Sequence, residues 1–549
     1  MKRTKRVVSG FIIFCACLVN VQAKTIFIAP TGTSSSQNST YDNPIGFDKL
    51  GTSMPTSLVV SGDTVYFLGG QYNVTRSFTL VQSGSNGTAN KRTFLGSYPG
   101  ETAVFDGRKL PYEKEVTGSD NIALKVPANF AHIRGIVVRY AGKNGFHITG
   151  SNNLLEACTA YANANTGIQL KGGGNNQLIN CDSFLNFDYK TMNGDKPDYG
   201  GNADGFADKQ YTSPAGTSNV YRGCRAWNNS DDGWDFYEHA SNGKPSEIRD
   251  SWCFGNGIPE YDMTEHPRYE TDKAYFETFR KGDKIIIPNL GNGNGFKVGG
   301  NKTKHDVIVS HCVAFGNKVK GFDQNNNGGS IEIYNCTAYE NSPNYGFGNN
   351  IPGVSIHIKN CISYNTRFRD AFLSGYTHSH NNWDLSPALN ITDVDFVGID
   401  KTSADMRRLA DGSLPDMDGL FRLSSNSQLI DKGINVGLPF YGQAPDLGAF
   451  EYDPNASSTS TPAIEEANVI AYPNPVKTNT TFTVILKEAA KVSLSLYNMR
   501  GERVYQTTHS TMEAGTHYLL FERNGLPSGV YLYQLNANGR TTGRHLILN

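Results

Sequence analysis

The sequence is poor in charged residues and has almost no charge imbalance. Asp, Glu, Lys and Arg make up 18% of the 549 residues, and the formal net charge is −1. A nucleic-acid-binding surface requires a basic stripe, so this balance argues against such a partner. After the first 23 residues there is also no apolar run long enough to span a bilayer, so no transmembrane segment is expected.

The N-terminus has the three parts of a secretory signal peptide. A basic "MKRTKR" precedes an apolar "VVSGFIIFCACLV" and a cleavage site "VQA" that ends at Ala23. We therefore expect residues 1–23 to be removed and the mature protein to be exported. The alternative is a lipoprotein anchored through Cys17, but Phe14 and Cys15 before it form a poor lipobox.

Cysteine is scarce, and its number excludes complete disulfide pairing. Cys15 and Cys17 leave with the signal peptide, and the odd number of seven remains. These seven mark a repeat that reads "CTAYAN" from 158, "CDSFLN" from 181, "CRAWNN" from 224, "SWCFGN" from 251, "CVAFGN" from 312, "CTAYEN" from 336 and "CISYNT" from 361. We predict a column of buried, reduced thiols, because free Cys behaves as a small apolar residue.

The repeat has a period of 23 to 25 residues, which is typical of a solenoid. Leucine-rich repeats share this period, but their leucine signature is absent. We therefore predict an all-β chain that forms a right-handed parallel β-helix with coils about 4.8 Å apart. The asparagines that end the repeats are expected to form a ladder at one turn; they are Asn163, Asn186, Asn229, Asn256, Asn317 and Asn341.

A second column follows the asparagines and consists of Gly, a large apolar residue and a variable residue. Its glycines are Gly167, Gly205, Gly233, Gly295, Gly321 and Gly346. Since the apolar residue should point inward, its neighbours on both sides should point outward. Two insertions, roughly 186–204 and 257–294, leave the solenoid at the same turn.

This alignment brings distant polar residues together on one outer face. Asp204 is expected one coil from Asp232, and Lys297 one coil from Asp235. With Asp231, four carboxylates and one lysine would then lie within about 10 Å, which is two coil spacings.

Crowded carboxylates repel one another unless a cation lies between them. We predict that Asp204, Asp231, Asp232 and Asp235 bind Ca²⁺, which takes six to eight oxygen ligands. Zn²⁺ would require His or Cys. Two simpler interpretations remain: acidic turns are often merely solvated or bind calcium for stability, and an exposed lysine is commonly only a solubility residue.

These groups suit β-elimination from a uronic acid polymer. Ca²⁺ would stabilise negative charge that develops on the sugar carboxylate, and Lys297 would take the C5 proton as general base. A neutral amine is required, so an alkaline optimum is expected. Calcium would lower the pKa of Lys297 and Asp323 would raise it, and the sequence leaves both possibilities open.

The segments "NADGFADK", "NNSDDGWDFYE" and "GNGFKVGG" resemble polysaccharide lyase family nine, whose members are right-handed parallel β-helix enzymes that cleave pectic polymers. The resemblance covers roughly residues 25–452. It implies that the four aspartates bind Ca²⁺, that Lys297 is the base and that the substrate is the pectin backbone, an acidic plant polysaccharide. The family includes pectate lyases and rhamnogalacturonan lyases, and no residue here separates the two.

The C-terminal region has a different composition and a different pattern of apolar residues. A Ser/Thr/Pro-rich linker, residues 453–467, follows a catalytic domain at 24–452. Residues 468–549 alternate apolar and polar positions and are predicted to form a small β-sandwich. "YPNP" at 472–475 and "GLPSGVYLY" at 525–533 resemble the sorting domain of type IX secretion cargo. This implies a secreted or surface-attached protein; an Ig-like spacer or a carbohydrate-binding module is the alternative. A monomer is expected.

Two other functions use the same fold. An inverting glycoside hydrolase would need two or three aspartates acting as acid and base about 6.5–9.5 Å apart and no metal, which leaves the role of Lys297 unexplained. A glycan-binding surface protein would use calcium only as a structural clamp.

Overall fold

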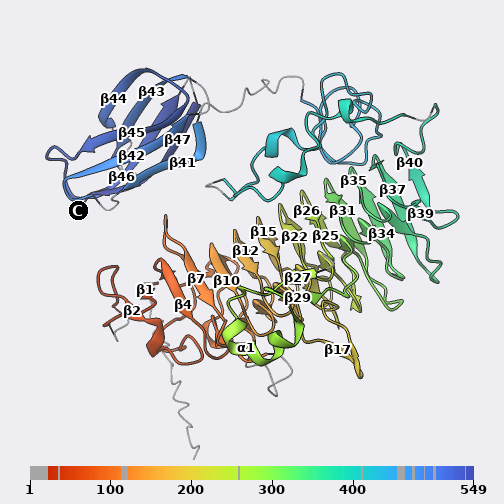
Figure 1. Cartoon of the computed structure of the whole chain (residues 1–549), viewed down its shortest axis with the longest axis horizontal. Helices are drawn as coiled ribbons and strands as arrows, with labels where there is room; N and C mark the ends of the chain where they lie inside the picture. The colour runs from red at the N-terminus through yellow and green to blue at the C-terminus, as the bar shows by residue number, and fades with distance from the viewer. Residues whose placement is uncertain are drawn as a thin grey trace, which may run out of the picture.

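The computed structural model describes residues 23–34, 38–112, 121–257, 260–387, 389–409, 412–453, 464–472, 476–486, 489–498, 503–537 and 540–548. Most of this chain winds into a long parallel β-helix, and the last part forms a separate antiparallel sandwich (Figure 1). The all-β prediction and the two architectures are therefore confirmed. Nearly all of the predicted signal peptide, residues 1–22, lies outside the described residues.

Three parallel sheets run the length of the β-helix, and we call them sheets A, B and C. Sheet A consists, in order, of β2 (Ile45–Gly46), β1 (Thr25–Ala29), β3 (Thr64–Phe67), β6 (Thr93–Ser97), β9 (Ala131–Arg134), β12 (Leu154–Glu156), β15 (Gln177–Ile179), β21 (Val220–Arg222), β25 (Ser246–Arg249), β31 (Val307–Ser310), β34 (Ser330–Tyr334), β37 (Ser355–Lys359) and β40 (Thr377–Ser379). Sheet B consists of β5 (Phe78–Thr79), β8 (Leu124–Val126), β11 (Phe146–Ile148), β14 (Ile168–Leu170), β19 (Phe206–Asp208), β23 (Trp234–Asp235), β30 (Phe296–Lys297), β33 (Phe322–Asp323), β36 (Tyr345–Phe347) and β39 (Ala371–Phe372). Sheet C consists of β4 (Gly70–Asn73), β7 (Ala103–Asp106), β10 (Ile136–Arg139), β13 (Thr159–Tyr161), β16 (Asp182–Phe184), β22 (Arg225–Trp227), β26 (Trp252–Phe254), β32 (Val313–Phe315), β35 (Thr337–Tyr339) and β38 (Ile362–Tyr364).

Alternation of apolar and polar residues explains how each short strand is placed. In β11, Phe146 and Ile148 are fully buried, whereas His147 between them is only partly buried. The alternation recurs in other strands such as β9, β12 and β34, whereas β19, β22 and β26 are buried at every position. The inward residues join one continuous apolar core. The outward residues form columns whose members come from different coils.

The predicted cysteine and asparagine columns are both present. All seven cysteines of the repeat are free and buried, and their thiols lie near backbone carbonyl oxygens, as in Cys224 Sγ to Leu178 O at 3.3 Å. The asparagines form a ladder in which five of the six donate from Nδ2 to the Oδ1 of the next ladder asparagine, as in Asn186 to Asn229 at 2.8 Å, and Asn341 donates to Asn344 in its own turn. The ladder therefore satisfies amide groups that would otherwise be buried without partners.

The outer face of sheet C carries stacked aromatic side chains. The ring centroids of Phe184 and Trp227 lie 4.2 Å apart, and those of Phe254 and Phe315 lie 4.8 Å apart. Residues from the segment after the last coil, among them Phe396, Phe421 and Leu447, pack onto this stack and bury it. This covering segment contains η5 (Asp393–Asp395), η6 (Lys401–Ser403) and η7 (Met417–Gly419).

A buried ion cluster fastens the covering segment to sheet C. Arg225 is 1% exposed and donates from Nε and Nη2 to Asp182 at 3.0 and 2.8 Å. Its Nη1 reaches the carbonyl oxygens of Ala404 and Met406, and Arg408 also donates to Asp182, at 2.6 Å.

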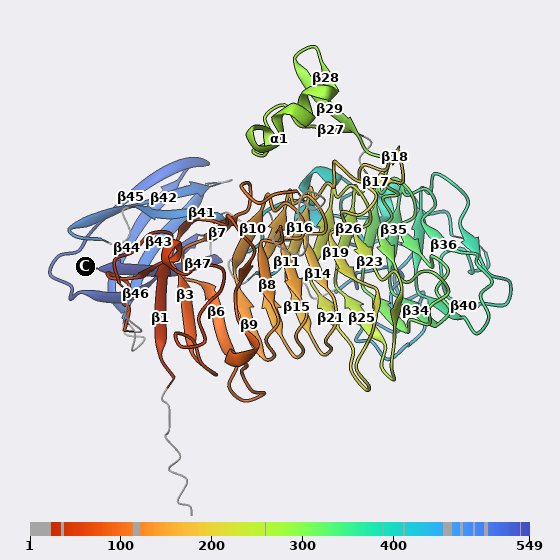
Figure 2. The ribbon, with the colours of Figure 1, turned by 90° about the horizontal axis from the view of Figure 1, so that it is seen from below.

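Both predicted insertions leave the β-helix between sheets C and B (Figure 2). The first carries a small hairpin of β17 (Met192–Asn193) and β18 (Lys196–Pro197). The second carries β27 (Glu260–Asp262), α1 (Tyr269–Phe276), η4 (Glu277–Phe279), β28 (Arg280–Lys281) and β29 (Lys284–Pro288). They share an apolar cluster that includes Phe187, Tyr189, Phe276 and Ile287, so the two insertions form one unit.

The C-terminal sandwich has two antiparallel sheets around its own core. One sheet consists of β41 (Ile464–Tyr472), β42 (Asn479–Leu486) and β45 (Gly515–Glu522). The other consists of β44 (Arg503–Met512), β43 (Ala490–Tyr497), β46 (Gly529–Ala537) and β47 (Arg540–Leu548). Strand β41 begins within the segment expected to be a linker, of which residues 454–463 are not described.

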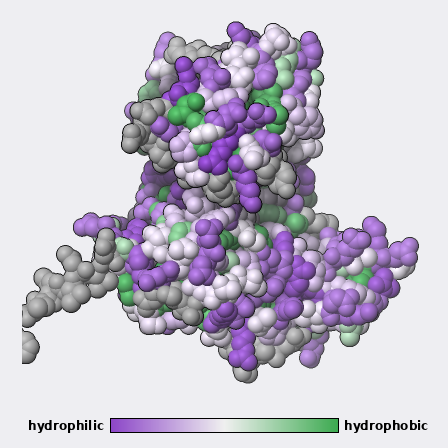
Figure 3. All heavy atoms as spheres, turned by 90° about the vertical axis from the view of Figure 1, so that its left-hand side faces the viewer, coloured by the Kyte–Doolittle hydropathy of each residue, from purple (hydrophilic) through white to green (hydrophobic). Residues whose placement is uncertain are grey.

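Within the described residues, none of the helices is both long and apolar enough to cross a membrane. On the face drawn in Figure 3, hydrophobic residues lie in small patches scattered among hydrophilic ones.

Candidate active site

The stacked strands of sheet B bring the predicted site residues together. Asp235 of β23 lies in register with Lys297 of β30 on the next coil. Asp204 precedes β19, whose Phe206 pairs with Trp234 of β23, so Asp204 lies one coil before Asp232. The coil assignment across both insertions, on which the predicted site depended, is therefore correct.

Three of the four aspartates form a tight group. Asp204, Asp232 and Asp235 each offer a carboxylate oxygen, and these oxygens lie within 4.8 Å of one another. All three side chains are at most 3% exposed. Asp231 is also buried, but its Oδ1 accepts a hydrogen bond from the backbone N of Asn292, at the base of the second insertion. It lies outside the tight group.

Lys297 faces this group and is 9% exposed. Its Nζ donates to Asp232 Oδ2 at 2.8 Å and lies 3.2 Å from Asp235 Oδ1. The ring of Tyr237 lies beside the ammonium group, with its centroid 5.6 Å from Nζ. The lysine predicted as a base is thus held at the acid cluster and does not enter the core.

A second lysine belongs to the site and was missed in the sequence argument, which counted only one. Lys209 Nζ donates to Asp204 Oδ2 at 2.8 Å and to Asp235 Oδ2 at 2.7 Å. Lys209 is the last residue of "NADGFADK" and lies four positions after the repeat glycine Gly205. The repeat alignment stopped two positions after that glycine; extended by two positions, it would have placed Lys209 on the outer face.

The pKa values reflect competition between burial and these two lysines. Burial, opposed by Lys209 and reinforced by Asp235, raises the pKa of Asp204 to about 7. Burial likewise raises the pKa of Asp231 far above its ordinary range. Burial also acts to raise the pKa of Asp235, but Lys209 and Lys297 outweigh it and lower this pKa to about 2.

The pKa of Lys297 is well above its ordinary value. Burial by itself lowers it, but the carboxylates of Asp232 and Asp235 outweigh that effect. Asp323, which was expected to act on Lys297, is in register with it on the next coil but pairs with Lys320, with 2.8 Å between Lys320 Nζ and Asp323 Oδ1.

The residues present fit a divalent cation of the calcium type. Four carboxylates opposite two ammonium groups leave two negative charges in a buried place. In the structure, the raised pKa values of Asp204 and Asp231 show where protons would compensate for those charges. The donors are all carboxylate oxygens, which suits Ca²⁺ and not Zn²⁺.

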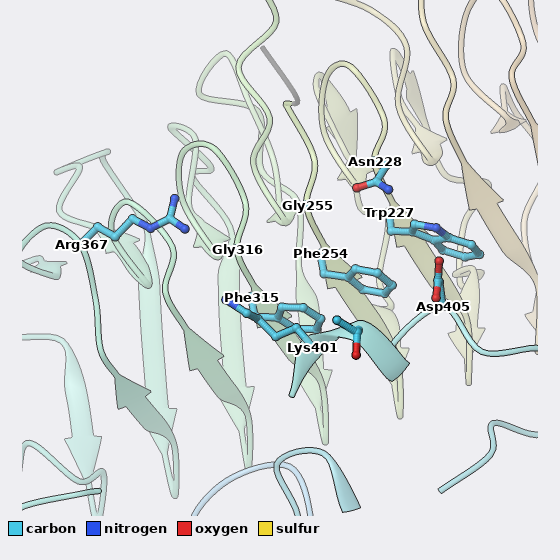
Figure 4. A pocket seen from close by; sticks show the side chains of 10 residues that line it. Trp227, Asn228, Phe254, Gly255, Phe315, Gly316, Arg367, Lys401 and Asp405 are labelled. Atoms are coloured by element: carbon cyan, nitrogen blue, oxygen red, sulfur yellow. The ribbon is translucent and has the colours of Figure 1, made fainter. Parts of the chain in front are cut away.

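A hollow of about 340 Å³ lies elsewhere, on the outer face of sheet C (Figure 4). It is lined by the edges of Trp227, Phe254 and Phe315, together with charged residues such as Arg367 and Lys401. None of the four aspartates lines it, so it is separate from the acid cluster.

Comparison with known proteins identifies the families of the two domains. Residues 26–382 match the family model "Pel9A-like, right handed beta helix region", and residues 470–549 match "Secretion system C-terminal sorting domain". A pectate lyase L from Dickeya chrysanthemi is 34% identical over 428 residues, which are 77% of this chain and 90% of the relative.

Solved structures of related proteins have the same fold. The crystal structure of pectate lyase Pel9A superposes with a TM-score of 0.64 at 32% identity and covers 79% of this chain and 98% of its own. A structure described as a rhamnogalacturonan lyase has a TM-score of 0.57 at 24% identity, covers 73% of this chain and 97% of its own, and shares the fold.

The protein is therefore a polysaccharide lyase built on a parallel β-helix, with a sorting domain for type IX secretion to the cell surface or beyond it. The chain belongs to the Pel9A-like right-handed β-helix family. The interpretation as a lyase is confirmed, and neither the glycoside hydrolase nor the non-catalytic glycan-binding protein is needed to explain the acid cluster.

Proposed function

We propose that the protein cleaves a pectic uronic acid polymer by β-elimination, with Lys297 as general base and with Asp204, Asp231, Asp232 and Asp235 as ligands of Ca²⁺. The observation that carries the proposal is the position of Lys297 Nζ, 2.8 Å from Asp232 Oδ2, at the edge of a buried group of three carboxylates. An amine beside a cation site is what removal of a C5 proton requires.

The residues of the site have distinct roles in this proposal. Bound Ca²⁺ would supply Lewis-acid stabilisation of the negative charge on the substrate carboxylate. Lys297 accepts the C5 proton at Nζ once it has lost its own proton, and the carboxylates that raise its pKa oppose that loss. Activity should therefore rise towards alkaline pH. Lys209 holds Asp204 and Asp235 in place by donating to both.

The substrate class rests on the pectate lyase relatives, which match the chain over most of its length. The partners we propose are the pectin backbone and, for export, the type IX secretion machinery, with the enzyme acting as a monomer. We further propose that residues 1–23 are the signal peptide, 24–452 the catalytic domain, 453–467 the linker and 468–549 the sorting domain.

The test uses the purified mature chain, polygalacturonate and rhamnogalacturonan, and follows the ultraviolet absorbance of 4,5-unsaturated products. Product should form with Ca²⁺, stop with EDTA and return when Ca²⁺ is restored. Saturated sugars released in EDTA would instead indicate hydrolysis and overturn the proposal.

A further inference from the structure

The hollow on the outer face of sheet C has a floor made of aromatic ring edges. Trp227, Phe254 and Phe315 form this floor. Their faces stack on one another, with ring centroids 5.6 Å apart for Trp227 and Phe254 and 4.8 Å apart for Phe254 and Phe315. Only the edges are therefore left for a ligand. Ring edges carry partial positive charge and favour contact with oxygen atoms.

The hollow is open because one column of turn residues lacks side chains there. The residue after the outward ring of each coil has a positive φ, and this column reads Ala162, Leu185, Asn228, Gly255, Gly316, Glu340 and Asn365. Since five members carry a side chain at this φ, the backbone does not require glycine. A Cβ atom on Gly316 would have no atom within 4 Å, and one on Gly255 would meet only the end of the Asn228 side chain. The two glycines thus leave space that the fold itself does not need.

Polar groups of both signs surround this space. Arg367 and Asp405 lie at opposite ends of the row of rings (Figure 4). Lys401 also lines the hollow and donates to the carboxylate of Glu340, which is not part of the lining. Two positive charges are thus balanced by two negative charges, so the rim offers no net attraction to an anion.

Two of the lining residues are held in place from behind. The guanidinium group of Arg225 donates to the carbonyl oxygens on both sides of Asp405, at 3.0 and 2.8 Å. Tyr261 of the second insertion donates its hydroxyl to the carbonyl oxygen of Asn228 at 2.6 Å. A site whose walls are already fixed loses little conformational entropy when a ligand binds.

These features fit a small, uncharged molecule rich in hydroxyl groups. The volume of about 340 Å³ lies at the lower end of the range for ligand sites. Each sugar hydroxyl can both donate and accept a hydrogen bond. It can therefore donate to the carboxylate of Asp405 or accept from Arg367 and Lys401, while the ring edges contact its oxygens.

We propose that this hollow binds a neutral sugar unit of a polysaccharide without carboxylate groups, and so anchors the enzyme away from its acid cluster. The inference goes beyond the proposed function and depends neither on Lys297 nor on Ca²⁺. It assigns the two faces to different sugars, with acidic units at sheet B and neutral units at sheet C.

The test is electrophoresis of the mature protein, in EDTA, through gels that contain β-1,4-galactan, arabinan or polygalacturonate. The double variant Gly255→Asn, Gly316→Asn fills the hollow with a residue that tolerates positive φ, as Asn228 and Asn365 show. At least one neutral polymer should retard the wild type, and the double variant should lose this retardation. The control Ala162→Asn changes the same turn position in a coil that does not line the hollow, and should be retarded like the wild type.

A second variant removes one polar end of the hollow without filling it. Asp405→Ala, at an exposed position, should be retarded less than the wild type by the neutral polymer, and thermal unfolding checks that every variant is folded. The inference is overturned if neither neutral polymer retards the wild type, or if the filled variant is retarded equally. A loss of retardation by polygalacturonate alone would also overturn it, because the hollow would then take an acidic sugar.

A turnover assay separates this inference from the proposed function. With Ca²⁺, the filled variant should keep the wild-type kcat and KM on polygalacturonate. If filling abolishes retardation by a neutral polymer but the wild type forms no unsaturated product, the proposed function fails and the neutral-sugar site stands. If product forms and no neutral polymer retards the wild type, the neutral-sugar site fails alone.

Discussion

Sheets B and C are built by the same coils in the same register, yet their outer faces differ completely. On sheet C the outward column carries rings such as Phe184, Trp227 and Phe254, and the covering segment buries them. On sheet B the corresponding column carries charged groups such as Lys125, Asp235 and Lys297.

The difference shows that the repeat decides which residues share a column, and residue type decides what that column does. Stacked rings on sheet C bury apolar area and attract a covering layer. Stacked charges on sheet B repel or pair with one another, and this is the face on which we propose that a cation and an anionic polymer bind. Substitutions confined to one face should therefore change either catalysis or stability.

The largest effect is expected on sheet B, from Lys297→Ala. Loss of a general base should reduce the rate of unsaturated product formation by about 10³-fold. The thermal unfolding midpoint should also fall, because Asp232 and Asp235 lose a buried partner, so activity is compared at a temperature where the variant is folded. Lys304→Ala, at an exposed lysine, is the control and should keep full activity. An active Lys297→Ala variant would remove Lys297 from the mechanism.

On sheet C, Arg225→Met should act on stability and not on catalysis. It leaves Asp182 buried with one partner fewer and detaches the backbone of Ala404 and Met406, so the free energy of unfolding should fall by about 3 kcal/mol. Denaturant unfolding measures this change. Arg222→Met, on the exposed side of sheet A, provides the control. An equally large loss of stability in that variant would show that the buried ion cluster of Arg225 and Asp182 does not account for the effect.

The acid cluster predicts how stability depends on pH in the absence of calcium. The folded-state pKa of Asp204, about 7, lies above its ordinary value of 3.8, so its stabilising contribution is complete below about pH 4 and is lost as the pH rises to about 7. Asp235 has a lowered pKa of about 2, so its contribution to stability is lost only as the pH falls from about 4 to about 2.

In EDTA, the contribution of Asp204 to the free energy of unfolding should fall by about 3 kcal/mol between pH 4 and pH 7. Ca²⁺ should then stabilise the protein more at pH 8 than at pH 5. Asp204→Asn should make the profile shallower but not flat, because the pKa of Asp231 is also raised by burial; an unchanged profile in that variant would assign the effect to other groups.

The smallest effect on catalysis is expected from truncation after Tyr452. The core of the sandwich and the core of the β-helix share no residues, so kcat and KM should remain within about twofold of the wild type because independent units add without coupling. Export to the cell surface should be lost, which fractionation of cells would show. A large drop in kcat would mean that the sandwich supports the active site.

Much of this arrangement could be predicted from the sequence, because in a β-helix the equivalent positions of successive repeats lie next to each other, one coil apart. The repeat placed Asp204 beside Asp232 and Lys297 beside Asp235, across insertions of different length. It did so because the ladder asparagines Asn186, Asn229 and Asn256 hold each coil to the next.

The rest depended on side-chain reach, which the repeat does not encode. Lys209 lies outside the aligned positions, yet its long side chain spans the gap between Asp204 and Asp235. In the same way, the partner of Asp323 is Lys320, three residues away in the same turn, and not Lys297 on the neighbouring coil.

The repeat in the sequence specifies the coils, their columns and the face on which the four carboxylates and Lys297 gather, because a parallel stack with a fixed spacing leaves the register no freedom. The balance of those charges and the choice of the covered face depend on the folded molecule, because the first depends on flexible side chains and the second on a non-repeating segment that packs on sheet C from far along the chain.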